Sequence, residues 1–467
     1  MKTLYEQLFQ YKNSDYYGFH MPGHKRNETR FQAELPYGLD ITEIEGFDDL
    51  HHAEGILKKA EERASRLYHS DETHFLVNGS TVGILSAILG CTDKGDKILI
   101  GRNCHKSVYH AMFLNELEPV YVYPEYETDL QINGAVSYED VKKALEENQD
   151  IKAVMLVSPT YDGVLSDVGA IAELVHKYNI PLIIDEAHGA HFGFHPYFPE
   201  NSNIKGADIV IHSVHKTLPS LTQTALIHLN GELIRKEKVR RYLHMLQSSS
   251  PSYILMASID YCMQILEEEG KKLFDDYVGM IQPLREELQG LQHLRIVKTG
   301  EYDNSKFVIS VKDTDLTSKE LAEILLEKYH LQMEMTAGSY VLAMTTIGDT
   351  KEGIERLKQA LFEIDETIHS KIEQSIPMEL PKMTTEYTSA KVEELVQRDG
   401  ISYLEWEKAK GHIAAEYAYI YPPGIPFIVP GEKITEEAAA YLGKYEQLGF
   451  VIEGIAVDKH IGVWKNG

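Results

Sequence analysis

Between Thr73 and Leu229 the chain alternates short apolar runs with segments of helical pattern, and this alternation restricts the fold more than any other feature. Segments such as Thr81–Gly90 and Val168–Tyr178 lie between the apolar runs and have the pattern of helices. Strands that alternate with helices form a mostly parallel sheet. We therefore predict a large α/β domain with a mostly parallel seven-stranded sheet. Its expected strands are Thr73–Asn78, Lys97–Gly101, Val120–Tyr123, Ala153–Ser158, Pro181–Asp185, Asp208–Ser213 and Thr224–Leu229.

The pattern changes after this domain. Strand-like runs at Phe307–Val311 and Tyr340–Thr345, with helix-like segments Ser318–Tyr329 and Lys351–Ile364, predict a small α+β domain. Two prolines within Ile376–Thr385 interrupt helix continuity and indicate a linker. The predicted division is an N-terminal arm (1–35), a large domain (36–270), a small α+β domain (271–375), a linker (376–389) and a small C-terminal domain (390–467).

The charge of the chain excludes some partners. The sequence has 46 Lys and Arg against 72 Asp and Glu, a net charge of −26. Nucleic acids and anionic membranes repel such a surface, so we expect neither as a partner. Three cysteines without a CxxC pair indicate a reducing compartment. Because the sequence shows no apolar signal segment and no membrane-spanning run, we expect a cytoplasmic protein.

Polar residues follow five of the predicted strands at their carboxyl ends. In an open parallel sheet, ligands bind at this edge. One site should therefore bring together hydroxyl groups, imidazoles, a carboxylate and an amine. The segments are Gly79-Ser80-Thr81, Arg102-Asn103-Cys104-His105-Lys106-Ser107, Pro159-Thr160-Tyr161-Asp162-Gly163, Asp185-Glu186-Ala187-His188 and Ser213-Val214-His215-Lys216.

Each of these residues has a structural interpretation when it is taken alone. Ser80 and Thr81 suit the first turn of any helix, where hydroxyl side chains cap free N–H groups. Asp185 ends an apolar strand, where a buried carboxylate needs a partner such as a salt bridge. His105 could be a structural histidine, and Lys216 a surface lysine.

Together, the residues match the needs of pyridoxal phosphate. Helix-terminal N–H groups and hydroxyls bind a phosphate, and a carboxylate keeps the pyridine nitrogen protonated. An imidazole stacks on the ring, and a lysine forms a Schiff base with the aldehyde. We therefore predict pyridoxal phosphate on Lys216. The pairs His20/His24 and His188/His191 have the spacing of metal ligands but no evident third ligand, so we expect no metal.

The same segments also carry a family resemblance. The sequence resembles the bacterial ornithine/lysine/arginine decarboxylases, which are fold-type-I pyridoxal-phosphate enzymes with the aspartate aminotransferase fold, in a short form without the N-terminal wing domain. Besides the strand-end segments, the resemblance rests on Phe19-His20-Met21-Pro22-Gly23-His24-Lys25, Leu221-Thr222-Gln223, Ser248-Ser249-Ser250-Pro251, Tyr421-Pro422-Pro423-Gly424-Ile425-Pro426 and Pro430-Gly431-Glu432.

The resemblance implies a role for each site residue. Lys216 would carry the Schiff base, Asp185 would pair with the pyridine nitrogen, and His105 and Ala187 would lie on opposite ring faces. His188, which follows Ala187, would also contact the cofactor. The other implied roles are phosphate binding by Ser80, Thr81, Ser213 and His215, binding of the substrate's distal cation by Glu334, and contact of Ser249 and Ser250 with the phosphate of a neighbouring subunit. We accordingly expect a homodimer with its active site at the subunit interface.

The predicted reaction is the decarboxylation of a basic amino acid, lysine or arginine in preference to ornithine, to its amine and CO2. The reaction would proceed through the Schiff base and a quinonoid intermediate, and Lys216 or His215 would return a proton to Cα. The product amine would serve polyamine biosynthesis, or the reaction would serve acid consumption. A fold-type-I aminotransferase is the main alternative, but Ser318–Thr350 contains no arginine for the substrate carboxylate. A catalytically silent homologue with a regulatory role is a second alternative, which no feature of the sequence supports.

Overall fold

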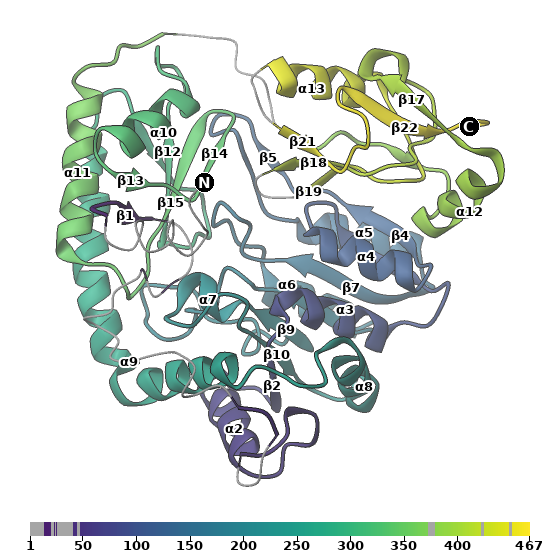
Figure 1. Ribbon diagram of the computed structural model, residues 1–467, viewed down its shortest axis with the longest axis horizontal. Helices are drawn as coiled ribbons and strands as arrows, with labels where there is room; N and C mark the ends of the chain where they lie inside the picture. Colours follow the sequence, from purple (N-terminus) through teal and green to yellow (C-terminus); the bar gives the residue numbers. More distant parts are fainter. Residues whose placement is uncertain are drawn as a thin grey trace.

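The computed structural model describes residues 14–19, 23, 25, 41–43, 47–371, 379–421, 425–447 and 451–467. Most of the predicted N-terminal arm, including His20 and His24, lies outside these residues, as does the start of the predicted linker. Figure 1 shows the arrangement of the described elements. No helix in the described part of the chain is both long enough and apolar enough to cross a membrane.

The predicted seven-stranded sheet is confirmed. Its strand order is β2-β10-β9-β8-β7-β3-β4. β10 runs antiparallel to both of its neighbours, and the other pairings are parallel. The strands are β2 (Glu72–Leu76), β3 (Lys97–Gly101), β4 (Glu118–Val122), β7 (Ile151–Val157), β8 (Leu182–Asp185), β9 (Ile209–His212) and β10 (Ala225–Leu229).

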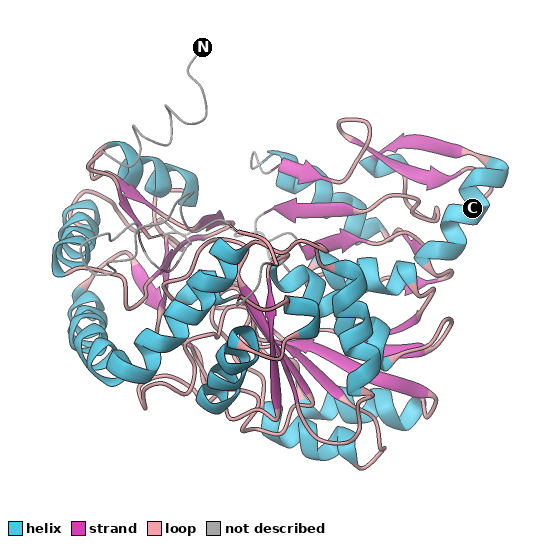
Figure 2. Cartoon of the chain, turned by 60° about the horizontal axis from the view of Figure 1, so that its bottom comes forward, coloured by secondary structure: helices cyan, strands magenta, loops and turns pink. Residues whose placement is uncertain are grey.

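Helices cover both faces of this sheet, because alternate side chains of each strand point to opposite faces (Figure 2). In β3, Ile98 and Ile100 belong to one apolar core and Leu99 to the other. The first core includes α3 (Gly79–Cys91), α4 (Lys106–Leu114) and α8 (Lys236–Leu246), and the second includes α5 (Tyr138–Glu147) and α6 (Val168–His176). The helix α2 (Ile56–Tyr68) packs against α9 (Tyr253–Glu287) in a third core.

A second, antiparallel sheet follows helix α9, and its strand order is β11-β12-β15-β14. The predicted boundary at residue 270 falls inside α9, which continues through Gly270. The strands are β11 (Arg295–Val297), β12 (Lys306–Ser310), β14 (Met335–Ala337) and β15 (Tyr340–Met344), accompanied by α10 (Ser318–Glu327) and α11 (Lys351–Asp365). Two short pairs complete this part: β1 (Tyr17–Gly18) with β13 (Leu331–Gln332), and β5 (Tyr126–Glu127) with β6 (Ile132–Asn133).

The C-terminal part has an apolar core of its own, which includes Trp406, Phe427 and Leu442. Its helices are α12 (Ser389–Asp399) and α13 (Glu436–Gln447). Its strands are β16 (Thr384–Thr385), β17 (Ile401–Glu405), β18 (Ala418–Tyr421), β19 (Ile425–Ile428), β20 (Glu432–Lys433), β21 (Val451–Glu453) and β22 (His460–Trp464).

A buried ion pair joins the C-terminal part to the large sheet. Arg102, which follows β3, donates to both carboxylate oxygens of Glu432 at 3.2 and 3.1 Å. It also donates to the backbone carbonyls of Pro426 and Phe427 at 2.5 and 3.1 Å. The two charged side chains are 1% and 0% exposed. Because each charge is removed from water, each depends on the other for compensation.

The variant Glu432→Gln should therefore lower the free energy of unfolding by about 3 kcal/mol or more, because it leaves the guanidinium of Arg102 buried without a counter-charge. Urea unfolding followed by circular dichroism measures this change. Glu436→Gln is the matched control, since Glu436 is 78% exposed and pairs with Lys410 at the surface. The control should change the free energy by at most about 0.5 kcal/mol. Equal effects of the two variants would show that the buried pair does not hold the C-terminal part.

Candidate functional site

A cavity of about 250 Å³ lies at the carboxyl ends of the large sheet's parallel strands. Its walls come from the strand-end loops, from the β5–β6 hairpin, from the second sheet and from the C-terminal part. Six of the predicted site residues line it, namely Ser80, His105, Asp185, Ala187, His188 and Lys216. The strand ends therefore deliver these side chains to one place, as the parallel topology requires.

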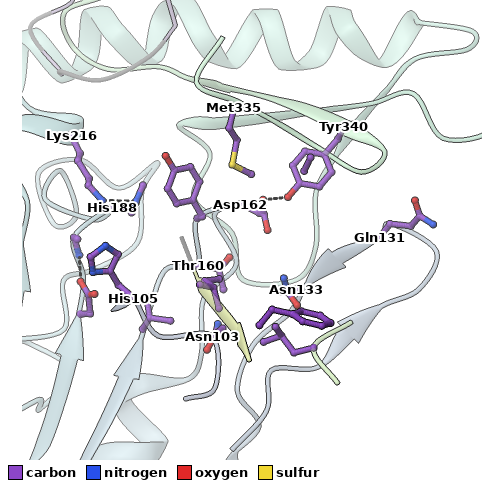
Figure 3. A pocket seen from close by; sticks show the side chains of 18 of the residues that line it. Asn103, His105, Gln131, Asn133, Thr160, Asp162, His188, Lys216, Met335 and Tyr340 are labelled. Atoms are coloured by element: carbon purple, nitrogen blue, oxygen red, sulfur yellow. Dashed lines mark hydrogen bonds between the residues drawn. The ribbon is translucent and has the colours of Figure 1, made fainter. Parts of the chain in front are cut away.

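Lys216 lies in the short helix α7 (Val214–Thr217), directly after β9. Its Nζ is 2.8 Å from Nε2 of His188 (Figure 3). Burial lowers the pKa of Lys216, although the negative charge of Asp185 opposes this effect. Burial and the charge of Lys216 hold the pKa of His188 well below its usual range. The site thus presents a buried amine whose nucleophilic, unprotonated form is favoured, beside a neutral imidazole.

Asp185 is the last residue of β8 and is buried. The backbone N–H of Ala187 donates to its Oδ1 at 3.1 Å and fixes the carboxylate at the strand end. Burial raises the pKa of Asp185, while the charge of Lys216 lowers it. An ionised carboxylate in this position is stabilised by a cationic ligand group placed against it.

His105 occupies the position before the first residue of α4. Its Nδ1 accepts from the backbone N–H of Ser107 at 3.3 Å and lies 2.8 Å from Oγ of the same residue. The ring proton is therefore on Nε2. Burial, followed by the charge of Lys216, lowers the pKa of His105 to about 3. A neutral ring held in a fixed orientation suits stacking against a flat ligand.

The first turn of α3 forms one end of the site. Oγ of Ser213 donates to Oγ of Ser80 at 2.9 Å. Asn78, which precedes α3, makes no side-chain capping bond, and the backbone N–H of Gly79 donates to the carbonyl of Gln223 at 2.9 Å. His215 lies nearby in sequence, and its Nδ1–H donates to the carbonyl of Thr224 at 2.8 Å. The hydroxyls and the helix N-terminus together suit an anion such as a phosphate.

Other predicted residues are not among the described residues that line the cavity. Thr81 is exposed on α3. The carboxylate of Glu334, between β13 and β14, accepts a hydrogen bond from the hydroxyl of Tyr161. Ser249 and Ser250 are exposed, and Oγ of Ser250 is 3.2 Å from a carboxylate oxygen of Glu43.

Several residues that line the cavity had no role assigned from the sequence. Asp162 is 4% exposed, and the hydroxyl of Tyr340 donates to its Oδ1. Burial raises the pKa of Asp162 to about 6. The motif Pro159–Gly163 was a signal for this residue, although its Asp-Gly pair is also typical of a turn. The remaining unassigned residues are Asn103, Gln131, Asn133, Val157, Thr160, Tyr161, Met335, Ala337, Leu380, Ile425, Phe427 and Tyr445.

The raised pKa of Asp162 predicts a pH-dependent stability. Because the folded protein favours the protonated form, the free energy of unfolding should fall as the pH rises from the ordinary pKa of an aspartate, 3.8, to the pKa of about 6 in the folded protein. That change corresponds to roughly 3 kcal/mol. Asp162→Asn removes the titrating group but keeps an oxygen for Tyr340, so the variant should become the more stable protein above pH 7. Urea unfolding of both cofactor-free proteins at pH 4 and pH 8 measures the difference, and parallel pH profiles would contradict the expectation.

Comparison with known proteins identifies the family. The family model described as "Orn/Lys/Arg decarboxylase, major domain" matches residues 2–337, and that described as "Orn/Lys/Arg decarboxylase, C-terminal domain" matches residues 370–460. An arginine decarboxylase of Bacillus subtilis (strain 168) is 33% identical over 475 residues, which cover 97% of this chain and 95% of the relative. The uncharacterized protein YaaO of the same strain is 36% identical over 464 residues, which cover 97% and 95%.

A solved structure shares the fold. The lysine decarboxylase LdcF of Francisella novicida superposes with a TM-score of 0.77 at 20% identity, covering 98% of this chain and 80% of that one. Structural neighbours of this kind are fold-type-I enzymes, which confirms the predicted fold class. The matches over both parts of the chain, together with the relatives' names, show that this protein is a decarboxylase and belongs to the Orn/Lys/Arg decarboxylase family.

Proposed function

We propose that this enzyme decarboxylates a basic amino acid, with arginine as the first candidate, and that it uses pyridoxal phosphate bound to Lys216. The observation that carries the proposal is the buried amine of Lys216 in the same cavity as the buried carboxylate of Asp185. Relatives of 32% and 33% identity are named arginine decarboxylases, which supports arginine over lysine.

The residues of the cavity fit the cofactor. Oδ1 of Asn103 and Nδ1 of His188 are buried without a hydrogen-bond partner among the described residues, and both side chains line the cavity. Buried polar atoms of this kind indicate that a polar ligand completes the site. Lys216 would hold the aldehyde carbon covalently, Asp185 the ring nitrogen, and Ser80 with the α3 N-terminus the phosphate.

The bound cofactor supplies an electron sink for the electrons released when the bond from Cα to the carboxyl group breaks. Asp185 keeps the ring nitrogen cationic, because a buried carboxylate stabilises a positive charge beside it. His105, neutral and held by Ser107, would stack on the cofactor ring, and the small side chain of Ala187 on the cavity wall would leave room for that ring. Lys216 or His215 returns a proton to Cα. The position of Lys216 on the cavity wall favours Lys216.

Apolar side chains support the reaction by limiting the access of water. Ile425 and Phe427 from β19 and Leu380 from the segment before β16 line the cavity. They come from the C-terminal part, which the Arg102–Glu432 pair holds against the large sheet. A site closed to water strengthens the electrostatic interactions within it.

We further propose a homodimer with the active site at the subunit interface. The exposed positions of Ser249 and Ser250 support a role at such an interface, where they would contact the partner's phosphate site. Glu334 remains a candidate for contact with the substrate. All three cysteines are free, which supports a cytoplasmic location, and the product amine suits polyamine biosynthesis.

Reduction with borohydride tests the attachment of the cofactor. The holoenzyme should carry a pyridoxyl label on Lys216, and mass spectrometry of the digested protein locates it. Lys216→Ala should lose this label and lose at least about 1000-fold in CO2 release, because the covalent nucleophile is missing. Lys271→Ala, at a lysine whose side chain is 88% exposed and pairs with Asp275 at the surface, is the control and should keep both. A label on another lysine would contradict the assignment of Lys216.

Product analysis tests the reaction and the substrate. Incubation with arginine, lysine and ornithine in competition should yield agmatine first, with one CO2 for each amine formed. The yield should not depend on an added keto acid, because decarboxylation needs no amino-group acceptor. Product formation that requires 2-oxoglutarate would instead identify an aminotransferase.

A further inference from the structure

Asp162 is a buried carboxylate on the cavity wall for which the reaction outlined above has no use. It is 4% exposed, and the hydroxyl of Tyr340 donates to its Oδ1. None of the ion pairs among the described residues includes Asp162. A carboxylate has further acceptor positions after one hydrogen bond, and a buried one without a counter-charge is costly. The remaining acceptor positions of the Asp162 carboxylate can therefore bind a cationic ligand group.

The other carboxylates near the cavity differ from Asp162 in this respect. Asp185 has the charge of Lys216 acting on it. Glu334 accepts from Tyr161, and its negative charge acts on Lys216. The family resemblance assigns the distal cation of the substrate to Glu334, but in this chain Glu334 is not among the described lining residues.

The position of Asp162 in the cavity matches the shape of a basic amino acid. Lys216 and His188 lie at one side in Figure 3, and Asp162 and Tyr340 lie farther across, toward Gln131. The apolar side chains of Met335, Ala337 and Phe427 line the same cavity, together with the amides of Gln131 and Asn133. An amino acid whose reacting end is at Lys216 would extend an apolar stem along these walls and carry its charged end to Asp162.

We propose that Asp162, held in place by Tyr340, binds the distal cation of the substrate and thereby determines the selectivity for basic amino acids. This inference rests on the proposed function. A guanidinium fits best, because its planar set of N–H donors can bind the carboxylate while further donors reach amide oxygens such as those of Gln131 and Asn133.

The test compares Asp162→Asn with the wild-type holoenzyme at pH 8, using agmatine and n-heptylamine, an amine of similar length with an uncharged tail. Titration calorimetry measures the affinity for each amine. Agmatine should bind at least about tenfold more weakly to Asp162→Asn, because a charge-assisted hydrogen bond is lost. The affinity for n-heptylamine should stay within about twofold. The KM for arginine should rise by at least the same factor as the Kd of agmatine, with a smaller change in kcat.

Two further variants separate the roles of the neighbouring residues. Tyr340→Phe keeps the charge of Asp162 but removes its positioning bond, so it should weaken agmatine binding by a few-fold and spare n-heptylamine. Tyr340→Phe also tests the proposal if Asp162→Asn does not fold. Glu334→Gln should change the binding of the two amines by similar factors. If Glu334→Gln alone removes the preference for agmatine, the proposal for Asp162 is wrong.

Two results distinguish the role proposed for Asp162 from the reaction proposed for the enzyme. A wild-type enzyme that releases no CO2 from any basic amino acid would refute the proposed reaction, while the two amines would still report on Asp162. A wild-type enzyme that produces agmatine, with an unchanged preference for agmatine over n-heptylamine in Asp162→Asn, would refute the inference alone.

Discussion

The chemistry of this enzyme depends on the removal of ionisable side chains from water at one edge of the large sheet. Burial lowers the pKa of Lys216 and raises that of Asp185, and both effects follow from the cost of a charge in a medium of low polarity. The same two residues on an open surface would be a protonated amine and a solvated carboxylate. Their burial favours the uncharged, nucleophilic form of the amine and makes the carboxylate a strong partner for a cationic group.

The closure of the cavity extends this constraint to the C-terminal part of the chain. Arg102 directly precedes Asn103, which lines the cavity, and its guanidinium donates to the carbonyl of Phe427, which lines the same cavity. The bond between Arg102 and Glu432 thus fixes the loop after β3, which carries Asn103, beside the apolar wall formed by Phe427. An ion pair far from the reacting atoms therefore contributes to the exclusion of water at them.

The sequence was sufficient to predict the parts that follow from local patterns. Most strands of the large sheet are short apolar runs, and the parallel topology brings Asp185 and Lys216 to one edge. The wall formed by Phe427 was not predictable, because it reaches the cavity through contacts between residues far apart in the chain. The role proposed for Asp162 was not predictable for the same reason, since its partner Tyr340 lies 178 residues away. The boundary at residue 270 was placed at a glycine that α9 accommodates within its helix.

Asp162 and Asp185 show how one residue type serves two needs. The partner proposed for Asp185 is a resident cofactor, whose positive charge is present throughout the reaction cycle. The partner proposed for Asp162 arrives and leaves with each substrate, so its carboxylate must remain buried without a counter-charge between turnovers. The bond from Tyr340 reduces that cost without removing it. The remaining cost of the buried charge would be a source of selectivity, because an amino acid with an uncharged tail would leave the carboxylate of Asp162 unpaired.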